Sequence, residues 1–351
     1  MVKIIGSIST TRSQCKYQED RGVLSIDGKD GPMVLGIFDG HSTAFASDYC
    51  RRHMRTVVYQ LIQNTPSIRL DPKLTPTIKA ITKTLDAGKF IETDVKGAVI
   101  INSDDEGSDK DHSDDDNDDD DFEDDDLIFT LDDEDRLQEY KCDSMRSVLQ
   151  NAFKIVNESF LGELEDGGCT ACFSVVINNT LWVANAGDSR CIIGGKDGKV
   201  KFATVDHKPD NPTEKARIVA ADHTVEIVQE LANGKRIPVA RVDGNLACSR
   251  SIGDSDMKDF GVPQEKQAVT CVPDVFEHPI AAGTDRFVVL ASDGLWDVMS
   301  SEQVAEFVYK RIKKGKIDQG VVDSVANELV LHATRKLKSY DNTTVVLGVF
   351  V

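Results

Sequence analysis

Cysteine, positive charge and long apolar stretches are all scarce in this sequence. Eight cysteines among 351 residues are too few for a scaffold held together by disulfides. No apolar run approaches the roughly 20 residues that a membrane-spanning helix needs, and the first residues lack the apolar core of a signal peptide. We therefore expect no membrane partner, and reduced thiols in the cytoplasm, the nucleus or both.

Lysine and arginine number 41 against 60 aspartates and glutamates, which leaves a net charge of −19. Such an acidic chain is unsuited to nucleic acid, whose phosphates are bound by cationic side chains, so we expect no direct nucleic-acid partner. The charge is concentrated, because residues 104–126 contain sixteen acidic residues and one lysine. The rest of the chain is close to neutral, and 40% hydrophobic residues provide ample material for a core.

Residues 65–141 are interpreted as an insertion into one domain that spans residues 1–351. The insertion begins with three prolines, shows little sustained periodicity and contains the acidic run, residues 104–126. The run has one aromatic residue and almost nothing to bury, so we expect disorder there. Two hypotheses remain open for it. It is either a solvated loop that only adds solubility, or a segment that recruits basic proteins.

Apolar runs bounded by turn residues predict strands, and amphipathic stripes predict helices. Strands are expected at 3–9, 33–38, 171–177, 181–186, 191–193, 200–205, 286–291 and 343–350. Helices are expected from Ser42 or Thr43 to Asn64, over 145–160, from Asn211, from Ser300, and over 322–337. The four runs between 171 and 205 read as an antiparallel meander. Because no regular βαβ rhythm appears, the simplest architecture is two antiparallel sheets covered by helices.

Carboxylates recur where strands end or begin. Asp39-Gly40 and Asp293-Gly294 follow two apolar runs, Asp341 precedes the last strand, and Glu19-Asp20 pairs two carboxylates early in the chain. Carboxylates gathered at one sheet edge repel each other unless a cation lies between them, and oxygen ligands suit Mg²⁺ or Mn²⁺. Each site taken alone is also explained by ordinary turn chemistry.

Ten short motifs, taken together, resemble one family. They are Gln18-Glu19-Asp20, 36–41 (GIFDGH), 168–171 (GCTA), 183–190 (VANAGDSR), 206–209 (DHKP), 241–247 (RVDGNLA), 249–254 (SRSIGD), 273–275 (PDV), 290–298 (LASDGLWDV) and 341–345 (DNTTV). In this order they resemble the metal-dependent serine/threonine protein phosphatases of the 2C type. The motifs cover nearly all the chain outside the insertion. The resemblance implies an α+β fold, a four-layer αββα sandwich of two antiparallel β-sheets flanked by helices.

The resemblance also implies a binuclear centre of two Mn²⁺ or Mg²⁺ ions. Asp39 would bridge the ions, with the Gly40 carbonyl and Glu19 on one ion and Asp293 and Asp341 on the other. Asp20 would act through waters. A water that bridges the two ions would attack the phosphorus of a phosphoserine or phosphothreonine.

His41 would protonate the leaving oxygen as general acid, a role that suits a group titrating near neutrality. Some family members show a third, weakly bound ion, which Asp188 and Asp297 would match here; these two are equally well explained as hydrogen-bonding turn residues. We expect phosphoprotein substrates and a monomer.

The sequence departs from the family where substrate phosphate is bound. The family usually has an arginine four residues before the glutamate of the first motif, and Cys15 occupies that position here. Arg12 or Lys16 would have to substitute for phosphate binding, and a lysine offers a point charge instead of a bidentate fork. We therefore expect weaker substrate binding. Residues 208–267 should hold a flap beside the active site.

Other readings of the cysteines are less favourable. Cys169 and Cys172 form a C-x-x-C in a strand pattern without a second pair, which favours buried thiols over zinc. Cys15 and Arg21 match the spacing of a cysteine phosphatase, but the carboxylates between them would repel a phosphate. The alternative to an enzyme is a weak or inactive phosphatase-fold protein that recruits basic proteins through the acidic run.

Overall fold

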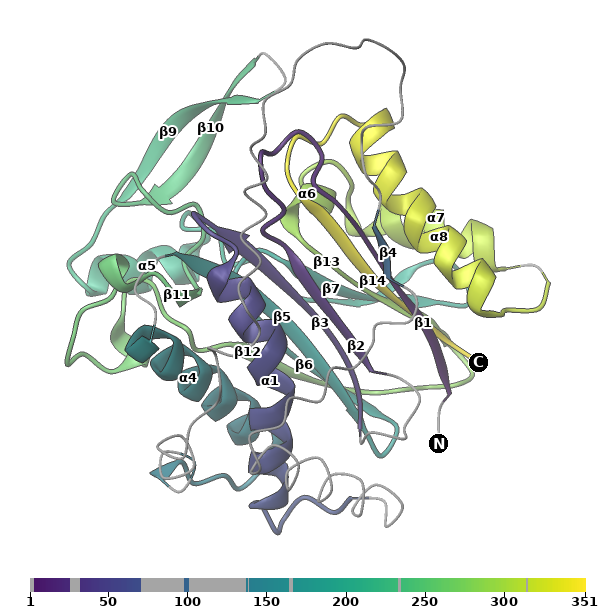
Figure 1. The fold of residues 1–351 in the computed structure, drawn as a ribbon, viewed down its shortest axis with the longest axis horizontal. Helices are drawn as coiled ribbons and strands as arrows, with labels where there is room; N and C mark the ends of the chain where they lie inside the picture. The colour runs from purple at the N-terminus through teal and green to yellow at the C-terminus, as the bar shows by residue number, and fades with distance from the viewer. Residues whose placement is uncertain are drawn as a thin grey trace, which may run out of the picture.

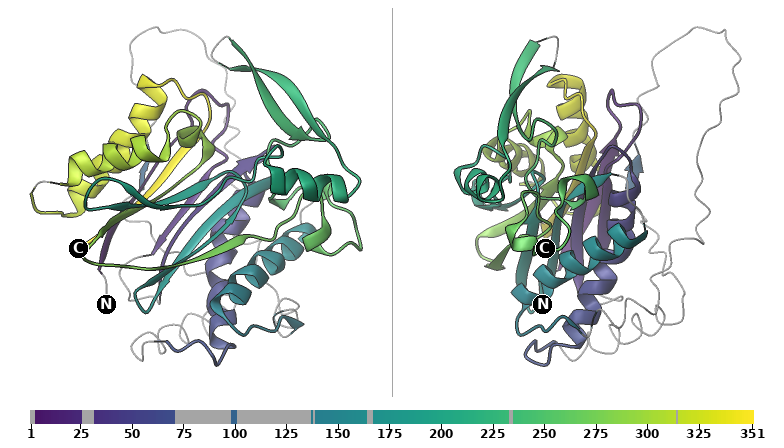
Figure 2. Two further views of the ribbon diagram at one scale, coloured as in Figure 1. Left: turned by 180° about the vertical axis from the view of Figure 1, so that it is seen from behind. Right: turned by 90° about the vertical axis from the view of Figure 1, so that its left-hand side faces the viewer.

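The computed structural model shows four layers, in which two β-sheets pack face to face and helices cover both outer faces (Figures 1 and 2). The structure describes residues 3–25, 32–70, 98–100, 137, 139–163, 167–232, 235–313 and 315–351. The acidic run and most of the predicted insertion lie outside the described residues. The predicted α+β sandwich is confirmed.

The first sheet has six strands in the order β4-β1-β14-β13-β7-β8. Their bounds are β1 Ile4–Thr11, β4 Ala98–Ile100, β7 Arg190–Gly195, β8 Val200–Ala203, β13 Asp285–Ala291 and β14 Thr343–Phe350. All described pairs in it are antiparallel except β1 with β4. The short strand β4 belongs to the predicted insertion, which therefore adds an edge strand to this sheet.

The second sheet runs in the order β12-β6-β5-β3-β2, with β11 paired to β5. Its strands are β2 Arg21–Ser25, β3 Met33–His41, β5 Gly168–Ile177, β6 Thr180–Ala186, β11 Ile252–Gly253 and β12 Asp274–Pro279. A separate hairpin, β9 Val225–Ala232 with β10 Lys235–Val242, projects from the body and occupies the predicted flap region (Figure 1).

Alternating side chains along the strands build the layers. In β3, Leu35 and Ile37 face the core between the sheets, whereas Val34 and Phe38 face the helices on the other side. The outer helices are α1 Phe45–Gln63 and α4 Met145–Glu163 on the second sheet, and α7 Ser301–Ile312 and α8 Gln319–Leu331 on the first. Three apolar cores result, one in each space between neighbouring layers.

Local helix signals in the sequence are mostly confirmed. Helix α5 Pro212–Ala220 begins after Asn211, whose side chain accepts from the backbone of Thr213 at 3.2 Å. The capping box at Ser300 opens α7. No described helix is both long and apolar enough to cross a bilayer.

Three local predictions are wrong. The helix α1 begins at Phe45 after Ala44, and Ser42 has a φ of 69°, so neither Ser42 nor Thr43 is its cap residue. The helix α8 ends at Leu331, and a π-helical turn, His332–Lys336, separates it from Leu337. The strand β3 does not stop at Phe38, because it continues through His41.

The predicted meander is also wrong at its centre. The strands β5 and β6 pair with each other, and β7 pairs with β8, but β6 and β7 belong to different sheets. The chain changes sheet in the three residues 187–189. Turn chemistry between two apolar runs does not say whether the second run returns to the same sheet, and this crossing places Asp188 between the sheets.

Candidate metal centre

Strand register brings the predicted carboxylates to one end of the sandwich. Because Arg21 is paired with Phe38, the residues just before β2 continue alongside the end of β3, so that Asp20 lies beside Asp39. In the other sheet, Ala291 is paired with Val345. The residues after β13 and those before β14 therefore lie at the same end.

Three carboxylates from three different segments meet at this end. Asp39 lies near the end of β3, Asp188 lies in the crossing between the sheets, and Asp293 begins the short helix α6 Asp293–Trp296 after β13. One oxygen from each lies within 4.8 Å of the others, a spacing at which one cation can contact all three. Two of the three were predicted for the binuclear centre, and Asp188 for the third ion.

The cluster is electrostatically strained without a cation. Burial and the charges of acidic neighbours, Asp20 and Asp293 foremost, raise the pKa of Asp39 well above its ordinary value. Burial and nearby carboxylates do the same to the pKa of Asp293. Burial also raises the pKa of Asp20 to about 6. Ser292 Oγ donates to Asp20 Oδ2 at 2.7 Å, but Asp20 Oδ1 is buried without a hydrogen-bond partner among the described residues.

This donor set fits hard divalent cations. The converging groups are oxygens only, several of them are buried, and one buried oxygen lacks a partner, as expected where Mg²⁺ or Mn²⁺ binds. A dication would offset the mutual repulsion that raises these pKa values.

Backbone packing holds Glu19 next to Gly40. A Cβ on Gly40 would collide with the carbonyl oxygen of Glu19 and with Ser47 Oγ, so only glycine allows this approach. The Glu19 N–H donates to Asn342 Oδ1 at 2.6 Å. Asn342 thereby ties the segment before β2 to the segment before β14, which carries Asp341.

The loop between β1 and β2 lies against the predicted ligand Asp341. Cys15 Sγ lies 3.5 Å from Asp341 Oδ1, and burial together with Asp341 raises the pKa of Cys15 to about 11. Arg12 and Lys16 are both exposed on this loop. Asn342 Nδ2 donates to the carbonyl oxygens of Arg12 and Tyr17 at 3.1 Å, so the backbone of this loop is held beside the segment that carries Asp341.

His41 is paired with a carboxylate that received no role from the sequence. Its Nε2 lies 2.8 Å from Oδ1 and 2.9 Å from Oδ2 of Asp254. Burial opposes the effect, but this hydrogen bond and the charge of Asp254 raise the pKa of His41. Asp254 has a φ of 54°, and a Cβ on Gly168 would collide with its carboxylate, so glycine is needed for the pairing.

Lys208 lies beside the carboxylates predicted for a third ion. Its Nζ donates to Asp188 Oδ2 at 2.5 Å. Although burial acts in the opposite direction, Asp188 and Asp293 raise the pKa of Lys208 above its ordinary value. Asp297 is more exposed, and burial raises its pKa. The site predicted for a third ion therefore already has a cation beside it, the ammonium group of Lys208.

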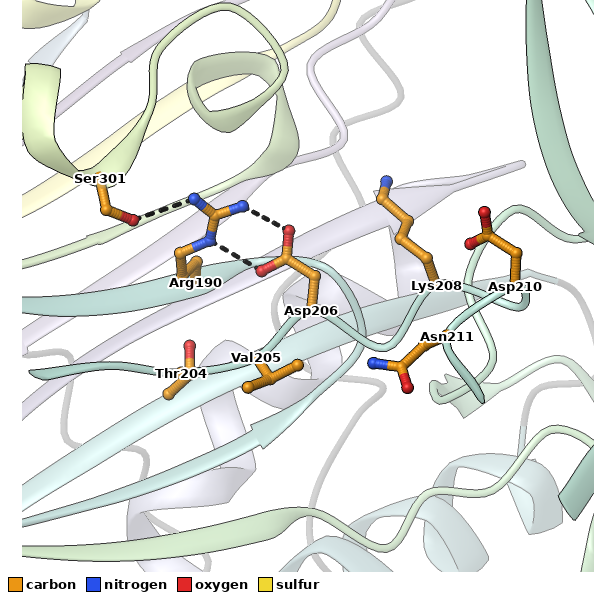
Figure 3. A pocket seen from close by; sticks show the side chains of 8 residues that line it. All are labelled: Arg190, Thr204, Val205, Asp206, Lys208, Asp210, Asn211 and Ser301. Carbon is orange, nitrogen blue, oxygen red and sulfur yellow. Dashed lines mark hydrogen bonds and ion pairs between the residues drawn. The ribbon is translucent and has the colours of Figure 1, made fainter. Parts of the chain in front are cut away.

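A pocket of about 540 Å³ adjoins Lys208 (Figure 3). The Arg190 guanidinium donates Nε to Asp206 Oδ1 at 2.8 Å and Nη2 to Asp206 Oδ2 at 2.6 Å, and its Nη1 donates to Ser301 Oγ at 3.1 Å. Because this fork is already occupied by a carboxylate, the pocket offers no open bidentate site for phosphate.

Sequence reasoning missed the supporting residues of the site. Asp254 and Lys208 both lie within quoted motifs, which was the available signal, but their partners lie 213 and 20 residues away in the chain. Ser292, which bonds Asp20, could have been inferred from its place in LASDG. Asn342 could have been inferred from its place after Asp341.

Comparison with known proteins agrees with this geometry. The family model for protein phosphatase 2C matches residues 110–342, more than half of the chain. A protein phosphatase 2C homolog 3 from Schizosaccharomyces pombe is 38% identical over 58% of this chain and 46% of its own length. A protein phosphatase 2C homolog 2 from Aspergillus fumigatus is 46% identical over 43% of this chain and 32% of its own length. The chain thus spans less than half the length of these two relatives.

Solved structures match over almost the whole chain. A phosphatase from Toxoplasma gondii has a TM-score of 0.63 at 20% identity and covers 99% of this chain and 94% of its own. A serine-threonine phosphatase 2C from the same organism has a TM-score of 0.59 at 23% identity, again over 99% and 94%. These structures show the shared fold, and the family match shows that the chain belongs to the protein phosphatase 2C family.

Proposed function

We propose that this chain hydrolyses phosphoserine and phosphothreonine monoesters of proteins at a centre of two Mn²⁺ or Mg²⁺ ions. The observation that carries the proposal is the convergence of Asp39, Asp188 and Asp293 within 4.8 Å, with raised pKa values for Asp39 and Asp293. A cluster that repels itself in this way is suited to binding cations, and the cations are suited to binding a phosphate dianion.

Asp39 is the residue proposed to contact both ions, because it is close both to Asp20, just before β2, and to Asp293, just after β13 of the other sheet. Glu19 and the Gly40 carbonyl would complete one side, and Asp341 the other. Asp20 is proposed to orient bound water through its unpartnered Oδ1. When bound, the ions would polarise the phosphoryl oxygens and lower the pKa of a shared water.

His41 is proposed to give its proton to the leaving serine or threonine oxygen. A protonated imidazole has two N–H groups, and in this fold Asp254 engages the one at Nε2. The other, at Nδ1, remains for the leaving oxygen. By raising the pKa of His41, Asp254 keeps the imidazole protonated over a wider pH range.

The alternative, an inactive phosphatase-fold protein, gains no support from the comparisons or from the site. The predicted carboxylates are all present in the sequence, and Asp39, Asp188 and Asp293 lie together. A third ion at Asp188 and Asp297 remains part of the proposal, as do phosphoprotein substrates and a cytoplasmic or nuclear location. Recruitment of basic proteins by residues 104–126 also remains a proposal, since the run lies outside the described residues.

The proposal is tested by hydrolysis of a phosphothreonyl peptide in the presence of Mn²⁺, Mg²⁺ or a chelator. The Asp293→Asn variant and the control variant Asp256→Asn, at an exposed position away from the ligand set, run beside the unchanged protein. We expect metal-dependent turnover that only Asp293→Asn abolishes. Absence of turnover from folded, metal-saturated protein would reject the activity.

A further inference from the structure

Two loops beside the metal centre form a positively charged surface, here called the basic rim. It consists of Arg12, Lys16, Arg335, Lys336 and Lys338, all of them exposed. The loops, one between β1 and β2 and the other between α8 and β14, lie side by side at the upper end of the sheets in Figure 1, near the label of α6. Ser13 Oγ donates to the Ser339 carbonyl at 2.6 Å, which joins them directly.

Carboxylates are few on these two loops. In 12–19 and 335–341 the only acidic residues are Glu19 and Asp341, and both belong to the predicted ligand set. Exposed Tyr17 and Tyr340, 61% and 41% accessible, belong to the same loops, and Lys16 Nζ lies 4.6 Å from the centroid of the Tyr17 ring. Metal ions bound at the centre would offset the charge of its carboxylates, and the exposed cations of the basic rim are suited to an anionic polypeptide.

The edge strand β4 delivers the chain to this surface. It pairs in parallel with β1, so that Ala98, Val99 and Ile100 are opposite Ile8, Ser9 and Thr10. Strand β4 therefore ends opposite Thr10, two residues before Arg12 of the basic rim. The acidic run begins four residues later at Asp104, a span of about 14 Å even when fully extended.

We propose that the acidic run, residues 104–126, binds the basic rim of the same chain. Two arguments favour the acidic run as the segment that binds there: its charge is opposite to that of the basic rim, and it is tethered close to it. The run has sixteen acidic residues and one lysine, against five cations on the basic rim. A short tether gives an effective concentration on the order of millimolar, which favours this segment over an acidic segment of another protein.

If the chain has the proposed phosphatase function, this contact also selects substrates, and this step rests on that function. The docked run lies at the approach to Asp341, where residues that flank a phosphoserine would pass. Acidic substrates, which extend over several cations of the basic rim, would compete with the run more strongly than a small phosphate ester, which reaches at most Arg12 or Lys16. The binding itself does not depend on catalysis and is tested separately.

Zero-length carbodiimide cross-linking of the full chain tests the contact, because it joins carboxylates to lysines that touch them. We expect cross-links from 104–126 to Lys16, Lys336 and Lys338, found by mass spectrometry. They should weaken by roughly tenfold between about 50 mM and 500 mM salt, as surface ion pairs are screened. A mixture of ¹⁵N-labelled and unlabelled chains separates contacts within one chain from contacts between copies.

A matched pair of variants completes the test. Lys336→Gln with Lys338→Asn removes two cations of the basic rim, and asparagine tolerates the φ of 61° at position 338. The control, Lys313→Gln with Lys316→Gln, removes two exposed lysines near the other end of α8. We expect only the first pair to reduce cross-linking at Lys16.

The outcomes separate the proposals. Deleting 104–126 should lower KM for an acidic phosphopeptide by roughly fivefold, the effect of freeing a site occupied about 80% of the time. The KM for a small phosphate ester should fall by a smaller factor, because the ester reaches only the phosphate-binding part of the basic rim. Cross-links that join different copies, that favour the α7–α8 lysines, or that ignore salt would overturn the contact. Absence of turnover from the full, metal-saturated chain that still shows the cross-links would instead reject the proposed function.

Discussion

The ammonium group of Lys208 lies 2.5 Å from Asp188 Oδ2, so the chain places its own cation beside the cluster that is proposed to bind metal. The two residues lie on either side of the strand pair β7–β8, Asp188 before it and Lys208 after it. An internal cation beside a cluster of carboxylates reduces the repulsion within it and competes with an added ion.

Replacing Lys208 with glutamine should strengthen metal binding near Asp188. The neutral side chain no longer competes with a dication, and at roughly 1.4 kcal/mol for each tenfold change, a modest electrostatic gain tightens binding about tenfold. Calorimetric titration with Mn²⁺ measures the affinity and the number of ions bound. Lys215→Gln, at an exposed position on α5, is the control and should bind as the unchanged chain does.

Replacing Asp254 with asparagine should slow turnover and change its pH dependence. Asp254 raises the pKa of His41, so its loss moves the alkaline limb of kcat to lower pH. Misplacement of the imidazole costs up to about 100-fold in kcat. Asp256→Asn, two residues away and exposed, should leave the pH profile where it was. An unchanged alkaline limb in Asp254→Asn would remove His41 from the role of general acid.

Replacing Cys15 with arginine should improve substrate binding. Cys15 is half-buried next to Asp341, at the position where the family usually has a phosphate-binding arginine. A charge-assisted hydrogen bond contributes about 1.5–3 kcal/mol, so KM for a phosphopeptide should fall by roughly tenfold or more. The Cys15→Ala variant controls for loss of the thiol. Equal KM values in both variants would show that position 15 does not contact the phosphate.

His53 should make the protein sensitive to acid. It is buried in α1, and burial lowers its pKa to about 4. Between pH of about 6.5 and 4 the unfolded chain therefore binds a proton at this position that the folded chain excludes. As the pH is lowered through this range, the free energy of unfolding decreases by up to about 3 kcal/mol. In His53→Leu this fall should be smaller.

The pKa of His223 is shifted in the opposite direction to that of His53. The hydrogen bond to Asp243 raises the pKa of His223. The protonated imidazole therefore adds to the free energy of unfolding at low pH, and this contribution is lost as pH rises through the raised pKa. Chemical denaturation across this pH range measures both effects. A His53→Leu variant with the acid sensitivity of the unchanged chain would contradict the assignment.

The sequence predicted those parts of the fold that local physics determines. The run 343–350, rich in β-branched and apolar residues, predicted the buried strand β14, and the capping pattern at Ser300 predicted the start of α7; both are confirmed. The carboxylates at strand ends predicted that ligands would gather at one sheet edge. The register of the strands explains this gathering, because antiparallel pairing of β2 with β3 places Asp20 beside Asp39.

What the sequence did not predict depends on contacts between distant segments. The change of sheet at 187–189 follows from packing of both sheets and leaves no local mark, although it positions Asp188. The pairing of His41 with Asp254 joins residues 213 positions apart and requires a left-handed backbone at Asp254. No pattern of neighbouring residues encodes such a pair.

The central claim is that Asp39 holds two divalent ions, and Mn²⁺ titration of the Asp39→Asn protein tests it most directly. We predict two tight sites in the unchanged chain and loss of both in the variant. We also predict that the metal-free variant is at least as stable, because one carboxylate has left a cluster that repels itself. Two Mn²⁺ ions bound by Asp39→Asn with unchanged affinity would contradict the account.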